Sequence, residues 1–183
     1  DSADNPNSTP IIIGCDETGS MGLLAETIIK KDLGVIMEGI YERKPVPDPH
    51  IMCMGIGDAY VDRAPLQVTQ FEASMVITDQ VKKIFLEGGG GGNDGESYLI
   101  AHYFAAFKTK CDSQTKRKKK GYLFTIGDEP PLATLTRDQI KEFIGDDVET
   151  DMTASDLFSI LQPNWNVFHL IIKPVGGDVV PRW

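Results

Sequence analysis

The sequence predicts an α/β fold, a doubly wound and mostly parallel β-sheet with helices on both faces. Short continuous apolar runs, typical of strands buried on both sides, alternate with segments of helical periodicity. One further run alternates apolar and polar side chains with period two, which indicates an edge strand paired antiparallel through a hairpin. The chain of 183 residues is long enough for one domain with a substantial core.

The elements follow in order along the chain. Strands are expected at 11–16, 50–58, 66–71, 122–128 and 167–172, and 66–71 is the expected antiparallel edge. Helices are expected at 21–43, 78–87, 96–110, 136–144 and 154–161, with Thr78 as the N-cap of the second. The polar residues 1–10 indicate a flexible N-terminal arm, and residues 11–183 indicate a single domain.

Composition narrows the classes of function. The net charge of −9 argues against a nucleic-acid binder, whose affinity depends on neutralising phosphates. No apolar run reaches the roughly 20 residues of a membrane-spanning helix, so no membrane insertion is expected. Cys15, Cys53 and Cys111 form no CxxC pair, which favours a reducing, cytoplasmic setting, and Cys111 follows a helix in a position that could be exposed. The basic run 116–120 indicates a solvated loop.

Polar turns follow several of the predicted strands. In a doubly wound sheet, ligands bind at this edge, outside the carboxyl ends of the strands. The first of these turns is Asp16-Glu17-Thr18-Gly19-Ser20, in which one carboxylate and the hydroxyls of Thr18 and Ser20 occupy alternate positions. Such hard oxygen ligands suit Mg²⁺, with Mn²⁺ or Ca²⁺ as alternatives. These turns contain no His or Cys, which argues against zinc.

Two more turns supply oxygen donors to the same edge. A run of five glycines, 88–92, precedes the candidate oxygen donors Asn93, Asp94, Glu96 and Ser97, and Asp128 ends the strand at 122–128. With so few acidic ligands, the cation keeps an electrophilic position that an acidic group of a partner could fill. Taken singly, the first turn could instead be a helix N-cap made by Thr18 or Ser20, and the glycine run a flexible connection.

These motifs together resemble those of the von Willebrand factor A (VWA) domain family. Asp16 to Met21 is similar to the family's DxTGSM metal-ion-dependent adhesion site (MIDAS), 90–97 to its GGGDxPES turn, and 126–131 to its IGDxPP strand end. The resemblance spans roughly residues 11–172 and implies a Rossmann-like sheet. It also implies that the chain stops short of the family's final strand, which the end at Trp183 approaches.

The resemblance implies a role for each ligand. Thr18 and Ser20 would bind the metal directly, and Asp16 and Asp128 would act largely through water. Asn93 stands where the family has Thr or Asp, and Glu96 is the next candidate for that role. The implied function is a non-enzymatic, metal-dependent protein–protein interaction module that binds a carboxylate of a partner protein. Intracellular family members often serve as adaptors for AAA+ ATPases or in stress and defence assemblies.

Three alternatives stay open at this point. A Mg²⁺-dependent phosphatase could use Asp16 as its nucleophile, although haloacid-dehalogenase-like enzymes need a second Asp where Thr18 stands. A nucleotide-binding loop could use the glycines, but no P-loop lysine follows them. A VWA scaffold with an inactive metal site is the third.

Overall fold

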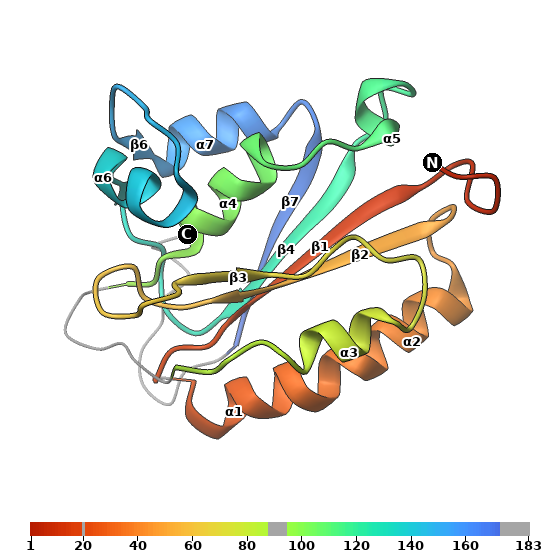
Figure 1. Ribbon diagram of the computed structural model, residues 1–183, viewed down its shortest axis with the longest axis horizontal. Helices are drawn as coiled ribbons and strands as arrows, with labels where there is room; N and C mark the ends of the chain where they lie inside the picture. The colour runs from red at the N-terminus through yellow and green to blue at the C-terminus, as the bar shows by residue number, and fades with distance from the viewer. Residues whose placement is uncertain (20, 88–94, 173–183) are drawn as a thin grey trace.

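The computed structural model describes residues 1–19, 21–87 and 95–172. Its centre is a five-stranded sheet in the order β3-β2-β1-β4-β7 (Figure 1). The strands are β1 (Thr9–Asp16), β2 (Pro49–Ile56), β3 (Leu66–Val68), β4 (Gly121–Gly127) and β7 (Trp165–Ile171). All neighbouring pairs are parallel except β2 and β3. The predicted α/β class and the antiparallel edge strand are therefore confirmed.

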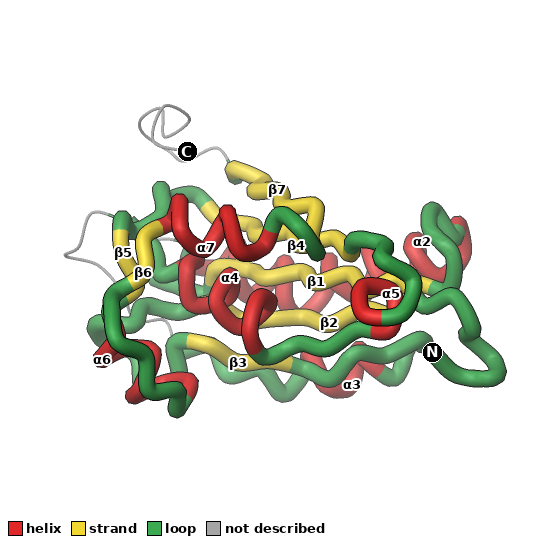
Figure 2. The backbone as a smooth tube through the Cα atoms, turned by 90° about the horizontal axis from the view of Figure 1, so that it is seen from above, coloured by secondary structure: helices red, strands yellow, loops and turns green. Residues whose placement is uncertain are grey.

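Helices cover both faces of this sheet, as Figures 1 and 2 show. One face carries α1 (Gly22–Thr27), a π-helical turn (Ile28–Asp32), α2 (Leu33–Arg43) and α3 (Ile77–Val81). The other carries α4 (Tyr98–Phe107), α7 (Ala154–Leu161), and the short α6 (Arg137–Gln139) with its π-helical extension (Ile140–Ile144). A small hairpin of β5 (Thr134–Leu135) and β6 (Met152–Thr153) joins this second layer.

The continuous apolar run of β1 is explained by burial on both faces. Ile11 and Ile13 pack in the cluster beneath α1–α3, whereas Ile12 packs in the cluster beneath α4 and α7. Successive side chains of a strand point to opposite faces, so a central strand needs apolar residues at every position. The strand can therefore carry a charged residue only where it leaves the core, and it ends at Asp16.

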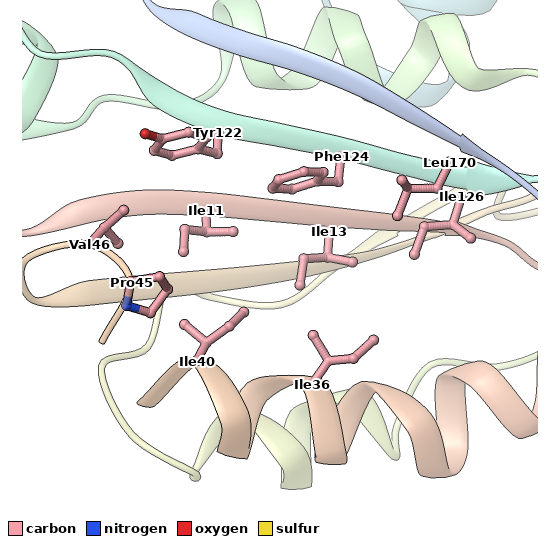
Figure 3. A pocket seen from close by; sticks show the side chains of 10 residues that line it. All are labelled: Ile11, Ile13, Ile36, Ile40, Pro45, Val46, Tyr122, Phe124, Ile126 and Leu170. Atoms are coloured by element: carbon pink, nitrogen blue, oxygen red, sulfur yellow. The ribbon is translucent and has the colours of Figure 1, made fainter. Parts of the chain in front are cut away.

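The face toward α2 leaves a groove of about 400 Å³. Figure 3 shows apolar side chains of β1, β4 and β7, among them Ile13, Phe124 and Leu170, facing Ile36 and Ile40 of α2 across it. The expected approach to a sixth strand, residues 173–183, lies outside the described residues. No helix among residues 1–19, 21–87 and 95–172 is long and apolar enough to cross a membrane.

Several local expectations were wrong. The helix expected at 78–87 is the shorter α3, whose N-cap is Val76, and the Thr78 hydroxyl donates to the Met75 carbonyl at 2.7 Å. A short helix, α5 (Asp112–Thr115), precedes the basic loop, and Cys111 before it is buried. Too few residues form α5 and the β5–β6 hairpin for either to show a sequence period.

Candidate functional site

The candidate site lies where β1 and β4 end. These strands are parallel neighbours with Cys15 opposite Ile126, so Asp16 and the residues that follow Gly127 reach the same edge of the sheet. Glu96 reaches this edge from the segment before α4. Its backbone N–H donates to the Pro130 carbonyl at 2.8 Å, and its carbonyl accepts from the Leu132 N–H at 3.0 Å. Two turns distant in sequence are thereby fixed to each other.

Asp16 is the most enclosed group of the site. It is fully buried, and its Oδ1 accepts hydrogen bonds from the backbone N–H of Thr18 at 2.9 Å and from the Thr18 hydroxyl at 2.6 Å. Its Oδ2 accepts from the hydroxyl of Tyr98, the first residue of α4, at 2.9 Å. Bonds on both oxygens fix the plane of the carboxylate.

Thr18 joins the first turn to the second. Its hydroxyl lies 3.0 Å from Oε1 of Glu96, a residue 78 positions away in sequence. The helix that follows begins after Met21, which makes no side-chain capping bond, so the Thr18 hydroxyl is directed at the two carboxylates rather than at a helix end. The N-cap alternative is therefore wrong for Thr18, and for Ser20 it lies outside the described residues.

Burial and mutual repulsion make the site a poor place for uncompensated negative charge. The pKa of Asp16 is raised to about 6, chiefly by burial and to a smaller extent by the charge of Asp128, while the hydrogen bonds from Thr18 and Tyr98 oppose the rise. Burial, followed by the charge of Asp16, raises the pKa of Glu96 to about 8. Burial also raises the pKa of Glu17 to about 7. Ionised carboxylates here need a positive partner.

The structure thus brings together four of the six predicted ligands. Asp16, Thr18 and Glu96 are in direct contact, and Asp128 is near enough for its charge to act on both Asp16 and Glu96. Ser20 and Asn93 lie outside the described residues.

Ser97, one of the predicted oxygen donors, also belongs to this edge, as do Tyr98 and Asp58, which were not predicted from the sequence. Asp58 follows β2 and is almost fully buried, and its charge raises the pKa of Glu96. The Ser97 hydroxyl accepts from the Ala59 N–H at 3.0 Å, which ties the turn after β2 to the start of α4. Asp58 could have been found in the sequence, because it stands at the end of a buried apolar run, as Asp128 does.

Gly127 provides the space that Tyr98 occupies. A Cβ atom at this position would lie 1.8 Å from the Tyr98 hydroxyl oxygen and 3.0 Å from the Asp16 Cβ. We expect Gly127→Ala to displace Tyr98 and to lower the free energy of unfolding by about 1–3 kcal/mol, as measured by urea denaturation. The control is Gly39→Ala, because nothing lies within 4 Å of its added Cβ and alanine is favoured over glycine inside α2, so this variant should be at least as stable as the wild type. A Gly127→Ala protein as stable as the wild type would contradict this packing.

The oxygen atoms that could bind a cation at this edge belong both to carboxylates and to a hydroxyl. Among the described residues, no group of three or more His, Cys, Asp or Glu side chains is arranged to hold a metal ion. A cation at this edge would therefore need hydroxyl oxygens as well as carboxylates, and the Thr18 hydroxyl is the described group in that position.

Comparison with known proteins identifies the fold alone. No family model and no curated protein matches the chain. Two crystal structures of the pilus adhesin SpaC from Lactobacillus rhamnosus GG are similar to it. The open conformation aligns at 11% identity and a TM-score of 0.51, covering 73% of this chain and 16% of the adhesin chain. The other form aligns at 10% identity and a TM-score of 0.58, covering 91% of this chain and 25% of the adhesin chain. This chain thus spans a quarter or less of the adhesin's length.

Proposed function

We propose that this chain is a metal-dependent protein–protein interaction module of the VWA type, which binds an acidic group of a partner protein through a divalent cation. The observation that carries the proposal is the contact of the Thr18 hydroxyl with both Asp16 and Glu96, which joins two turns from distant parts of the sequence. Mg²⁺ is the proposed ion, with Mn²⁺ or Ca²⁺ as alternatives.

The described residues fit such an ion. Oε2 of Glu96 is buried and has no hydrogen-bond partner among the described residues. None of the described lysines and arginines forms an ion pair with Asp16 or Glu96. Carboxylate and hydroxyl oxygens are the hard ligands that Mg²⁺ prefers. Two buried carboxylates, Asp16 and Glu96, to which no lysine or arginine of the described residues is paired, support a cation as the missing charge.

Roles within the site follow from the sequence resemblance and the contacts together. Thr18 and Ser20 would bind the ion directly, Asp16 and Asp128 would act through water, and Glu96 or Asn93 would complete the set. The ion would supply an electrophilic position for a carboxylate of the partner. An adaptor role beside an AAA+ ATPase and a cytoplasmic location remain part of the proposal.

Titration calorimetry with Mg²⁺ tests this function. We expect a single binding event in the wild type that is lost in Ser20→Ala and in Asp128→Ala. It should be retained in Asp138→Ala, because the Asp138 side chain is 90% exposed and belongs to α6. A glutamate-containing peptide should then bind only with Mg²⁺ present. Equal heats from all four proteins would contradict the proposed metal site and would favour a scaffold with an inactive metal site.

Tyr98 should matter for the ion because its hydroxyl donates to Oδ2 of Asp16 at 2.9 Å. Groups that orient metal ligands from the second shell typically contribute a factor of about 10–100 to metal affinity. We expect Tyr98→Phe to weaken Mg²⁺ binding by about tenfold, measured by the same titration.

The control for Tyr98→Phe is Tyr103→Phe on the same helix, because the Tyr103 hydroxyl donates to Asp146, away from the site. Equal affinities in Tyr98→Phe and the wild type would show that the orientation of Asp16 does not affect the ion.

A further inference from the structure

A polar cavity lies at the edge of the sheet opposite the proposed metal site, where β1, β4 and β7 begin. Its volume is about 400 Å³, within the range of small-molecule sites. Thr9, Tyr122 and Asn166 line it from the starts of these three strands, and Tyr122 lies beside both Ile11 and Asn166 in the sheet. The amino ends of the strands are at the right of Figure 1, near α5 and the N-terminus.

Positive charge is concentrated on one wall of this cavity. The chain has a net charge of −9, yet residues 116–120 are five consecutive basic residues. Arg117, Lys119 and Lys120 line the cavity. Among the described residues, neither Lys119 nor Lys120 forms an ion pair, so no carboxylate holds their ammonium groups.

Nearby acidic groups already have partners. Asp1 pairs with Arg117 and also accepts a hydrogen bond from the Ser8 hydroxyl, and Asp112 pairs with Lys116 at 3.0 Å. Asp48 accepts from the Asn7 N–H at 2.9 Å. Asp1 and Asp112 therefore add negative charge beside Arg117 and Lys116 of the basic run. A long polyanion such as a nucleic acid would meet these carboxylates, whereas a small anion inside the cavity would meet chiefly the lysines.

The turn that presents these lysines is well fixed. Lys118 takes a left-handed conformation with φ 56°, and its amino group donates to the Thr115 carbonyl at 3.1 Å. The Lys119 N–H donates to the Ser113 carbonyl at 2.8 Å. Ser113 itself lines the cavity, and its hydroxyl is buried with no hydrogen-bond partner among the described residues. The cavity is therefore lined by two lysines without an ion pair and by a buried hydroxyl without a hydrogen-bond partner among the described residues.

We propose that this cavity binds a small ligand through a phosphate or pyrophosphate group. Lysine ammonium groups bind phosphate as point charges, and the Thr9 hydroxyl and the Asn166 amide line the same cavity as further polar groups. The ring of Tyr122 and the side chain of Pro47 form an apolar part of the wall against which the organic portion of the ligand would pack. The site is separate from the metal edge.

Calorimetric titration with inorganic pyrophosphate and with ADP, both in the presence of EDTA, tests the proposal. We expect saturable one-to-one binding to the wild type that weakens at least about tenfold, or 1.4 kcal/mol, in Lys119→Gln/Lys120→Gln. Tighter binding of ADP would identify a nucleotide-like ligand, and equal binding would identify the phosphate groups alone as the determinant. Ser113→Ala should also weaken binding, and a normal melting temperature would show that this variant is folded.

The matched control is Lys82→Gln/Lys83→Gln, which removes two adjacent exposed lysines at the end of α3 that do not line the cavity. The proposal would be overturned if the wild type bound neither pyrophosphate nor ADP. It would also be overturned if the two double variants weakened pyrophosphate binding equally. Tighter binding of a single-stranded oligonucleotide than of pyrophosphate would overturn it as well. Asp16→Asn should leave pyrophosphate binding unchanged, so this proposal and the metal site can fail separately.

Discussion

Asp16→Asn should weaken Mg²⁺ binding by about 100-fold or more, because it removes a full charge from a buried position beside the proposed ion. Asparagine has the same shape, and its side-chain oxygen can still accept the two hydrogen bonds that Thr18 donates, while its NH2 group can donate to the Tyr98 hydroxyl in place of the bond that Oδ2 accepts. The loss should therefore come from charge rather than from misfolding. Titration calorimetry at pH 8, where the pKa of about 6 leaves Asp16 ionised, measures it.

The same variant should be at least as stable as the wild type without metal. Burial and the charge of Asp128 both raise the pKa of Asp16, so its ionised form weakens the metal-free fold at pH 8. Asp138→Asn, an exposed carboxylate, is the matched control and should change neither property. An Asp16→Asn protein that binds Mg²⁺ like the wild type, or one that loses stability and affinity together, would contradict this account.

The second large effect is on the pH dependence of stability. In the metal-free protein, the free energy of unfolding should fall as the pH rises from 6.5 to 8. Glu96 has a pKa of about 8 and Glu17 of about 7, both raised chiefly by burial, so the folded state holds their protons more tightly than the unfolded state does. Their contribution is complete below the unfolded pKa and is lost as the pH rises through the folded pKa.

The histidines determine where this window begins. Burial lowers the pKa of His102 and of His169 to about 4, so both make the fold more stable as the pH rises toward 6.5 and oppose the carboxylates there. Above pH 6.5 the contribution of the histidines levels off as their unfolded forms lose the last protons, and the effect of the carboxylates dominates. We expect the melting temperature of the metal-free protein to be lower at pH 8 than at pH 6.5 by about 2–4 °C.

Mg²⁺ should remove this fall, since the ion stabilises the ionised carboxylates and binds more tightly as they lose protons. Glu96→Gln should flatten the profile without metal, whereas Glu142→Gln on the exposed side of the α6 extension should not. Melting curves recorded with EDTA and with excess Mg²⁺ across pH 6–8.5 make the comparison. A wild-type profile that falls equally in both conditions would argue against a cation at Glu96.

Much of the fold was predictable because its determinants are local in sequence. The runs 11–16 and 122–128 are apolar at nearly every position, which only strands buried on both faces require, and they correspond to β1 and β4. The predicted 21–43 helix corresponds to α1, a π-helical turn and α2. The π-helical turn was not predicted, since one additional residue in a turn barely disturbs an apolar stripe.

Only those residues of the candidate site that belong to a recognisable sequence motif were predictable. Asp16 and Thr18 follow a buried strand in a recognisable turn, and Glu96 was identified as the alternative to Asn93. Tyr98 was missed because an aromatic residue at the start of an apolar helix has no sequence feature that distinguishes a polar role from packing. Its role depends on the space above Gly127, which only the three-dimensional structure shows.

Diffraction from crystals grown with Mn²⁺ at pH 8 tests the central claim most directly, because the anomalous signal locates the ion without assumptions about its ligands. The account predicts one strong peak at the carboxyl ends of β1 and β4, at a coordination distance of about 2.1 Å from the Thr18 hydroxyl oxygen. The carboxylates of Asp16 and Asp128 should face the same ion. A peak elsewhere on the molecule, or no peak at this edge with Mn²⁺ in excess, would contradict it.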